Sequence, residues 1–262
     1  MRLHASLLFM PLSAIYLIAG CQETPTVSKW EVVVEKMEKK VGECDEAGDG
    51  CALVRFVYPR FTGDQPDLVA RVNDTVQWTL VRLITSVNPT DQQTPTLESA
   101  TQQFLNDYEE FRADVPDYEL GWSIEASGQV LTLNEKVLSV EFDSYSFTGG
   151  AHPNAFTILH NFELSTGKHL SLSDLVTDLD QFSAMAEAAF KKERELPPDA
   201  NLQEEGFFWD GPFVLPANFG ITREGIRLSY NPYEVAPYVL GPTEFTLSYQ
   251  ELGLLLRRDL LY

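Results

Sequence analysis

Residues 156–175 read FTILHNFELSTGKHLSLSDL, two apolar-rich segments on either side of the turn residues Ser165-Thr166-Gly167. A two-residue turn would leave the two strands with their apolar side chains on opposite faces. A type I turn followed by a left-handed Gly167 at a bulge instead places Leu164 opposite Lys168. The same register places Phe162 opposite Leu170 and His160 opposite Leu172. Because a slip by one residue would reverse the faces, we expect the bulged hairpin with a firm register.

This register gathers the apolar side chains of the hairpin on one face, made of Phe156, Ile158, Phe162, Leu164, Leu170 and Leu172. His160 falls on this face and His169 on the opposite one. We therefore expect that the two histidines cannot hold a metal ion together.

Outward from the hairpin, apolar spacing predicts helices that begin at Pro66 and end near Asn88, and that run through 97–111. A third helix follows a capping-box pattern at 177–180 and stops at Pro197-Pro198. Strands are expected at 52–58, ending at Pro59, and at 122–126, followed by a Ser127-Gly128 turn. Further strands are expected at 138–142, in a hairpin around Glu224-Gly225, and at 245–249 before a short final helix.

Strands and helices are segregated, and no alternating strand–helix–strand pattern is visible. This arrangement predicts an α+β fold in which antiparallel sheets with hairpins pack against a few helices. We expect two small domains in tandem, an N-terminal one over 46–150 and a C-terminal one over 151–262.

The N-terminus has the pattern of a lipoprotein signal peptide over residues 1–20. Arg2 precedes an apolar run that ends in Ile18-Ala19-Gly20-Cys21. An ordinary signal peptide that happens to contain a cysteine is the alternative. We expect lipid on Cys21 as the anchor, a tether over 21–45 and, because Gln follows Cys21, the outer membrane facing the periplasm in a Gram-negative host.

The chain is strongly acidic, with 39 acidic against 19 basic side chains and a net charge of −20. This charge argues against nucleic acid and against anionic lipid head groups as partners. It would attract a cationic partner, although the same charge also serves the solubility of an exported protein.

Cys44 and Cys51 remain once Cys21 carries lipid, and an even number of cysteines in an oxidising compartment favours a disulfide. A zinc pair lacks the further ligands of a tetrahedral site. A calcium loop built from Glu43, Asp45, Glu46 and Asp49 is an alternative, but its spacing is not that of an EF-hand. We expect the disulfide, and neither a metal nor another cofactor.

The stretch SFTGGAHPN at 146–154 offers a candidate ligand contact at His152 and Asn154. The alternative is a rigid connection in which Gly149 and Gly150 supply the backbone angles and His152 bonds the loop backbone. A second candidate contact surface is Tyr230, Asn231, Tyr233 and Glu234, with a proline-braced loop as its alternative. No nucleophile lies in a recognisable catalytic motif, so no catalytic residue is expected.

Three segments resemble the RsiV-type extracytoplasmic region, a tandem of two domains of unknown function that also precedes the catalytic module of PdaC-type peptidoglycan deacetylases. They are VLSVEFDSYSFTGGAHPN at 137–154, the F-L-TGK-L-L-DL pattern at 162–175, and GIRLSYNPYEVAPYVLGPTEFTLSYQEL at 225–252. The resemblance would cover residues 50–258 and implies a domain that binds lysozyme. We expect no sigma-binding segment, transmembrane helix or deacetylase module here, so neither sigma control nor deacetylation carries over.

We therefore expect a lipid-anchored, non-catalytic envelope protein that binds a lysozyme-like cationic protein. Asp107, Glu110 and Asp114 would share a helix face and are the candidate acidic surface for that partner. A module that binds or modifies peptidoglycan and a structural subunit of an envelope assembly are the alternatives. Exposed tryptophan and tyrosine side chains would favour the glycan.

Overall fold

The computed structural model describes residues 29–45, 48–90, 93–209 and 211–261. The predicted signal peptide and the lipid site at Cys21 lie outside these residues. None of the helices in the described ranges has both the length and the apolar character needed to cross a membrane.

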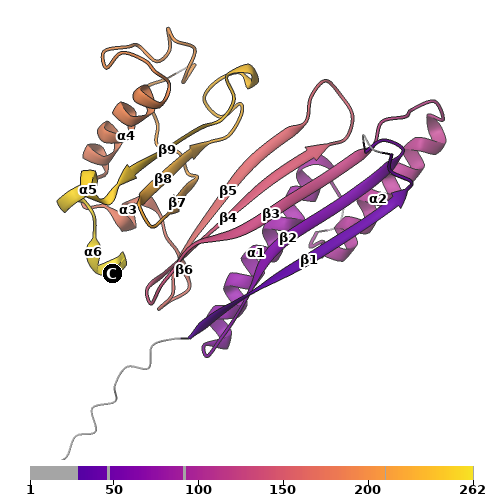
Figure 1. Ribbon diagram of the computed structural model, residues 1–262, viewed down its shortest axis with the longest axis horizontal. Coiled ribbons are helices and arrows are strands. Elements are labelled where there is room, and N and C mark those ends of the chain that lie inside the picture. The colour runs from indigo at the N-terminus through magenta and orange to yellow at the C-terminus, as the bar shows by residue number, and fades with distance from the viewer. Residues whose placement is uncertain (1–28, 46–47, 91–92, 210, 262) are drawn as a thin grey trace, which may run out of the picture.

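A six-stranded sheet forms the centre of the molecule, in the order β1-β2-β3-β4-β5-β6 (Figure 1). Its strands are β1 (Trp30–Gly42), β2 (Cys51–Gly63), β3 (Trp122–Leu133), β4 (Val137–Phe147), β5 (Asn154–Glu163) and β6 (Lys168–His169). Neighbouring strands are antiparallel except β2 and β3, which are parallel. The α+β fold with largely antiparallel sheets is confirmed, but the β2-to-β3 crossover through two helices was not predicted.

The two crossover helices, α1 (Pro66–Val87) and α2 (Leu97–Asp114), cover one face of this sheet. Pro66 opens α1, where its fixed φ suits the first helical turn, and Thr96 and Ser99 form a capping box at the start of α2. Both helices occur where apolar periodicity predicted them. Their inward side chains form the first core with those of the strands, including Phe56, Val72, Leu80, Phe104 and Phe142.

A second, three-stranded antiparallel sheet is built from β7 (Phe219–Ile221), β8 (Gly225–Tyr230) and β9 (Thr243–Ser248). The helix α4 (Leu179–Glu193) packs on β9, and short helical turns complete this part of the chain (Figure 1). These turns are α3 (Leu172–Leu175), η1 (Tyr238–Leu240), α5 (Tyr249–Leu252), η2 (Gly253–Leu255) and α6 (Arg258–Leu261). The second core centres on Phe190, whose ring contacts those of Phe207, Phe208, Tyr230 and Phe245.

The second sheet sits on the face of the first sheet that α1 and α2 leave open, over the start of β4 and the end of β5. There Asn161 donates to the Phe219 carbonyl at 2.6 Å, and the Ile221 amide donates to the Asn161 side chain. The buried carboxylate of Glu141 on β4 forms an ion pair with Arg227 on β8. Polar contacts that are buried in this way fix the two sheets against each other.

The free edge of β5 is occupied by two asparagine side chains from the second half of the chain. Asn231 accepts from the Thr157 amide at 2.7 Å and donates to its carbonyl at 3.0 Å, in the manner of a neighbouring strand. Asn218 donates to the same carbonyl and accepts from the Leu159 amide. The two amides therefore satisfy backbone groups that an edge strand would otherwise leave open.

The segment predicted as a tether, 21–45, contains the whole of β1. Its glutamates and lysines have the composition of a polar linker, because an edge strand exposes its unpaired backbone edge and many of its side chains to water. Trp30, Met37 and Val41 nevertheless pack against the first core. The sheet also continues across the boundary predicted at 150, since β4 and β5 pair on either side of it.

Two strands are longer than predicted. The Ser127-Gly128 turn is wrong, because β3 runs through both residues and Gly128 lies opposite Phe142. A Cβ on Gly128 would lie 2.7 Å from the Phe142 ring, so this glycine permits close packing. β2 likewise continues through Pro59, which is tolerated because β3 pairs with β2 only as far as Val57.

The hairpin register predicted for 156–175 is wrong by one residue. Glu163 pairs with Lys168 and Phe162 with His169, around a four-residue loop in which Gly167 is left-handed, as expected, at φ 71°. Phe162 and Leu164 enter the first core, whereas Leu170 and Leu172 enter the second. The assumption of one common apolar face fails because the two arms supply different cores.

As a consequence His160 and His169 lie on the same face, with ring centroids 5.3 Å apart. The prediction that they face opposite ways is therefore wrong. His160 is on the apolar side, as predicted, and bonds Thr79 Oγ1 through Nε2 at 2.8 Å. No group of three or more metal-binding side chains occurs in the described part of the chain.

Candidate functional site: a groove on the open face of the sheet

A groove of about 750 Å³ lies on the part of the sheet face that neither the helices nor the second sheet cover. Two rows of side chains cross four strands and form its floor. They are Glu38–Arg55–Glu125–Tyr145 and Lys40–Leu53–Ser123–Phe147. Each row is built by direct cross-strand pairing, so the rigid sheet sets the spacing of these side chains.

Arg55 is the central side chain of the first row. Its Nε donates to Glu38 at 2.9 Å and its Nη1 to Glu125 at 2.8 Å. The hydrogen bond to Glu38 contributes most to raising the pKa of Arg55. Beside this pair the Tyr145 ring is 42% exposed, which is high for an aromatic side chain on a sheet.

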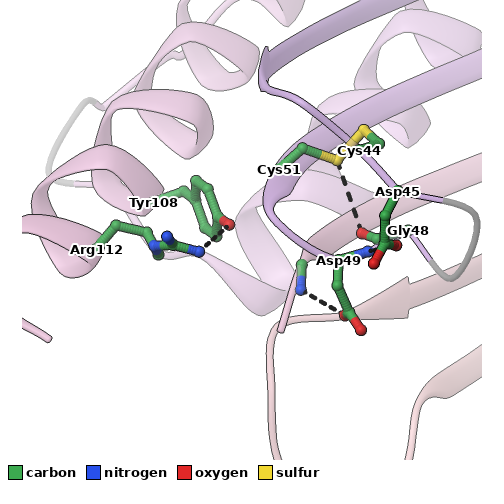
Figure 2. The surroundings of a disulfide bond; sticks show 8 residues. Cys44, Asp45, Gly48, Asp49, Cys51, Tyr108 and Arg112 are labelled. Carbon is green, nitrogen blue, oxygen red and sulfur yellow. Dashed lines mark hydrogen bonds between the residues drawn. A yellow bond between two sulfur atoms is a disulfide. The ribbon is translucent and has the colours of Figure 1, made fainter. Parts of the chain in front are cut away.

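The structure confirms the Cys44–Cys51 disulfide (Figure 2). Both cysteines line one rim of the groove. Within the disulfide loop the Asp49 amide donates to the Asp45 carboxylate at 2.9 Å. Asp49 in turn accepts from the Gly121 amide at 3.0 Å, which ties the loop to the chain that enters β3. The carboxylates of Asp45 and Asp49 thus hold backbone amides that shape this rim.

Pro153 lies at the other rim, and His152 holds it there. The His152 ring stacks on Tyr238 with centroids 3.9 Å apart, and its Nδ1 lies 2.9 Å from the Pro153 carbonyl. A carbonyl can only accept, so Nδ1 carries the proton, and Nε2 can accept from the Tyr233 hydroxyl at 3.3 Å. Tyr238 also donates to the Pro153 carbonyl. The His152–Tyr233–Tyr238 cluster therefore positions the groove rim.

The glycines before His152 have the backbone angles that the sequence predicted. Gly149 and Gly150 have φ values of 89° and 106°, in the region that favours glycine. A Cβ on Gly149 would also lie 2.5 Å from the Tyr118 hydroxyl. The loop needs both glycines to bring His152 and Pro153 to the rim.

The other predicted contact residues occupy different places. Tyr230 is buried in the second core, where its hydroxyl donates to the Val214 carbonyl at 2.6 Å and burial raises its pKa. Asn231 clamps β5 and also donates to Glu234. Asn154 begins β5 opposite Ser146. Of the predicted set, the structure brings His152 into contact with Tyr233, and Asn231 into contact with Glu234.

The predicted acidic surface lies on α2, on the helix side of the sheet and away from the groove. Glu110 and Asp114 are exposed. Asp107 is half-buried and accepts from Asn88 at 2.7 Å and from Gln103 at 2.6 Å. The exposed part of the predicted acidic surface is therefore limited to Glu110 and Asp114.

Sequence reasoning missed Arg55, Glu125, Tyr145 and Tyr238. The first three come together only when the parallel pairing of β2 with β3 is known. The alternation in ALVRFVY at 52–58, with Arg55 at an outward position, was the one signal that could have indicated a polar sheet face.

Comparisons with known proteins match the two halves of the chain separately. A family model described as "Deacetylase PdaC" matches residues 46–155, and one described as "Protein of unknown function (DUF3298)" matches residues 173–250. These matches support a PdaC-type/DUF3298 family. Most of the groove lining falls within the PdaC match, although Glu38, Lys40, Cys44 and Asp45 precede it. Asn218 and Asn231, which clamp β5, lie within the DUF3298 match.

The peptidoglycan-N-acetylmuramic acid deacetylase PdaC of Bacillus subtilis (strain 168) is 26% identical over 116 residues. The aligned region is 41% of this chain and 23% of that enzyme. The chain therefore spans less than a quarter of the relative that it matches. The RsiV-type and lipoprotein features stay predictions.

Two solved structures of DUF3298 family proteins share the fold. One, from Bacteroides fragilis NCTC 9343, has a TM-score of 0.65 and 17% identity, covering 88% of this chain and 94% of that one. The other, from Pseudomonas aeruginosa PAO1, has a TM-score of 0.63 and 22% identity, covering 88% and 96%. At these identities the likeness shows the fold alone.

Proposed function

We propose that this protein is a non-catalytic, envelope-associated module that binds glycan strands of peptidoglycan along the sheet groove. The observation that carries this proposal is the half-exposed Tyr145 ring beside the Arg55–Glu125 pair. A sugar ring can lie on the aromatic surface while its hydroxyl and amide groups bond to the charged side chains. The disulfide and the His152 stack hold both rims, so the groove is formed before a ligand arrives.

A binding role without catalysis is supported by how the groove carboxylates are used. Glu38 and Glu125 both accept from the same guanidinium. Acid–base chemistry on a glycan needs two carboxyl groups whose environments differ, one of them free to carry a proton. The deacetylase activity named for the relative belongs to a protein of which this chain matches 23%, and it is not part of the proposal.

Sedimentation of the purified protein with insoluble peptidoglycan tests the proposal. Tyr145→Ala is expected to lower the bound fraction several-fold, because it removes the stacking surface and leaves the sheet intact. Trp78→Ala is the matched control, since Trp78 is 59% exposed but lies on α1, with Arg82 over its ring at 5.6 Å. Equal binding by wild type and Tyr145→Ala, or loss only in Trp78→Ala, would contradict the groove as the glycan site.

A cationic protein such as lysozyme is the second candidate ligand. The net charge of −20 and the exposed Glu110 and Asp114 favour it, together with the resemblance to a lysozyme-binding domain. Glu110→Gln/Asp114→Asn is expected to slow association with lysozyme and to weaken the salt dependence of the rate. Calorimetry and stopped-flow kinetics would measure this, with a non-lysozyme protein of similar basic charge as control. Identical affinity for both basic proteins would remove this candidate.

We further propose that the protein is exported and anchored through lipid on Cys21, at the outer membrane facing the periplasm in a Gram-negative host. The small residues before this cysteine support the lipid anchor, and the peptidoglycan substrate named for the PdaC relative supports export. A structural role in an envelope assembly has no specific observation in its favour.

A further inference from the structure

We propose that two copies of this protein pair through β1, antiparallel, with Met37 of one copy opposite Met37 of the other. The pairing would join the two six-stranded sheets into one continuous sheet. The inference is independent of the proposed glycan binding.

β1 is the outermost strand of the sheet and is long and open (Figure 1). It runs from Trp30 to Gly42 without a proline, and within the described ranges its strand partner is β2 alone. Val32, Val33 and Val34 are 39%, 42% and 61% exposed. An exposed edge of this length and composition is a template for another strand.

The two edges of the sheet differ in whether side chains bond their open backbone groups. At the edge opposite β1, where β5 extends beyond the two-residue strand β6, Asn218 and Asn231 bond the backbone of Thr157 and Leu159 and block further pairing. No side chain of the described residues forms a comparable hydrogen bond with the backbone of residues 31–41. The chain therefore protects one edge and leaves the other available.

Geometry limits the possible registers. In an antiparallel pair, opposed residues place their side chains on the same face of the sheet. A strand that pairs with its own copy must therefore have the two-fold axis at a residue. With the axis at Lys36, this lysine lies opposite Lys36 of the second copy, so two like charges are opposed. The axis at Glu38 sets Glu38 opposite itself and Lys36 opposite Lys40. The axis at Glu35 sets Glu35 opposite itself.

The axis at Met37 is different, because every charged pair near it is complementary. Lys36 then faces Glu38 twice, and Glu35 faces Lys39 twice, while Val33 faces Val41. Within the described residues, no ion pair includes Lys36 or Lys39. Opposite charges in directly opposed positions stabilise a register, and like charges destabilise it. The sequence of β1 is thus self-complementary in one register.

The new ion pairs would extend ones that already exist. Glu38 accepts from Arg55 at 2.9 Å and Glu35 from Arg60 at 2.7 Å. Each glutamate would then lie between an arginine of β2 and a lysine of the second copy. Alternating charges in such a row form a network, which contributes more than isolated surface pairs do.

Charge-swapped variants test the pairing. Lys36→Glu/Lys39→Glu and Glu35→Lys/Glu38→Lys each place like charges opposite each other in the proposed register. Light scattering coupled to size exclusion should show wild-type dimers and a monomer for each variant alone. Mixing the two variants should restore the dimer, since all four opposed pairs are then complementary. Circular dichroism of each variant checks that it is folded.

Cross-linking tests the register itself. Met37→Cys should form a disulfide-linked dimer under oxidation, because opposed strand residues lie within disulfide reach. Lys36→Cys, the neighbouring position, should not. A wild-type protein that stays monomeric at all concentrations would overturn the proposal, as would a dimer that the charge variants leave unchanged. Cross-linking through Lys36→Cys but not through Met37→Cys would also overturn it.

Discussion

His160 shows how one largely buried side chain makes the stability of this protein depend on pH. Thr79 Oγ1 donates to the Thr75 carbonyl and therefore accepts a hydrogen bond from the Nε2–H group of His160. Burial, with a smaller contribution from the neighbouring His169, lowers the pKa of His160 to about 4. The neutral ring is therefore the form that fits the folded protein.

The sign of the pH effect follows from this shift. The unfolded chain binds a proton near pH 6.5 and the folded protein only near pH 4, so stability present above 6.5 is lost as pH falls through this window. We expect the free energy of unfolding to fall by ~3 kcal/mol on this account. Denaturant titrations of wild type and His160→Gln between pH 7 and 4 would measure it.

The glutamine variant keeps a donor for Thr79 but cannot titrate, so its unfolding free energy should depend less on pH. His169, whose pKa burial also lowers, contributes in the same direction and remains in the variant. Asp174 acts outside this window. Its bonds with Lys168 and then Ser171 lower its pKa to about 2, so its contribution is lost in stronger acid. Equal pH slopes for the two proteins would show that His160 is not the group responsible.

At the scale of single elements, apolar periodicity predicted the helices that bury one face. It did not predict the elements whose position depends on which strands are neighbours. Both crossover helices follow from the spacing of Val69, Val72 and Val76 and of Phe104 and Tyr108, because one face of each is buried. β1 could not be predicted, since a charged edge strand has the composition of a linker. The groove was equally hidden, because its floor depends on which strands are neighbours and not on any local motif.

The stability of a variant at Gly128 tests whether β3 is continuous through this residue. Gly128→Ala would place a Cβ 2.7 Å from the Phe142 ring and 2.8 Å from Pro59 Cδ. We expect a loss of ~1–3 kcal/mol in the free energy of unfolding, as for other overpacked sites. Thermal and chemical denaturation would measure it. Gly211→Ala is the control, since no described atom beyond its chain neighbours lies within 4 Å of the place that its new methyl group would take.

A turn at Ser127-Gly128 would give the contrary result. An exposed turn would accept the alanine at Gly128 with little change in stability, as at Gly211. Equal denaturation midpoints for the two variants would therefore contradict the continuous strand β3.

At the scale of the whole molecule, one buried ion pair links the two sheets. Glu141 is 3% exposed, accepts from Gln129 at 2.7 Å, and pairs with Arg227 of the second sheet. Arg227→Leu would leave a carboxylate buried without its cation. Such a loss typically costs about 3–5 kcal/mol, and we expect a drop of that order in chemical denaturation.

The double variant Glu141→Gln/Arg227→Leu separates the buried charge from the lost contact. The introduced amide can still accept from Gln129 and carries no charge, so most of the stability should return. A single variant no less stable than the double one would mean that the pair does not hold the sheets together.

The clamped strand β5 also limits how chains of this kind can be reshuffled over evolutionary time. The PdaC match ends at 155 and the DUF3298 match begins at 173, yet the strand between them is completed by β4 from one side and by Asn218 and Asn231 from the other. A genetic crossover in this interval would give two descendants. One would have a β5 edge without its asparagine partners, and the other would have Asn218 and Asn231 side chains without a strand to bond. The two segments are therefore expected to be inherited together, as one exchangeable unit.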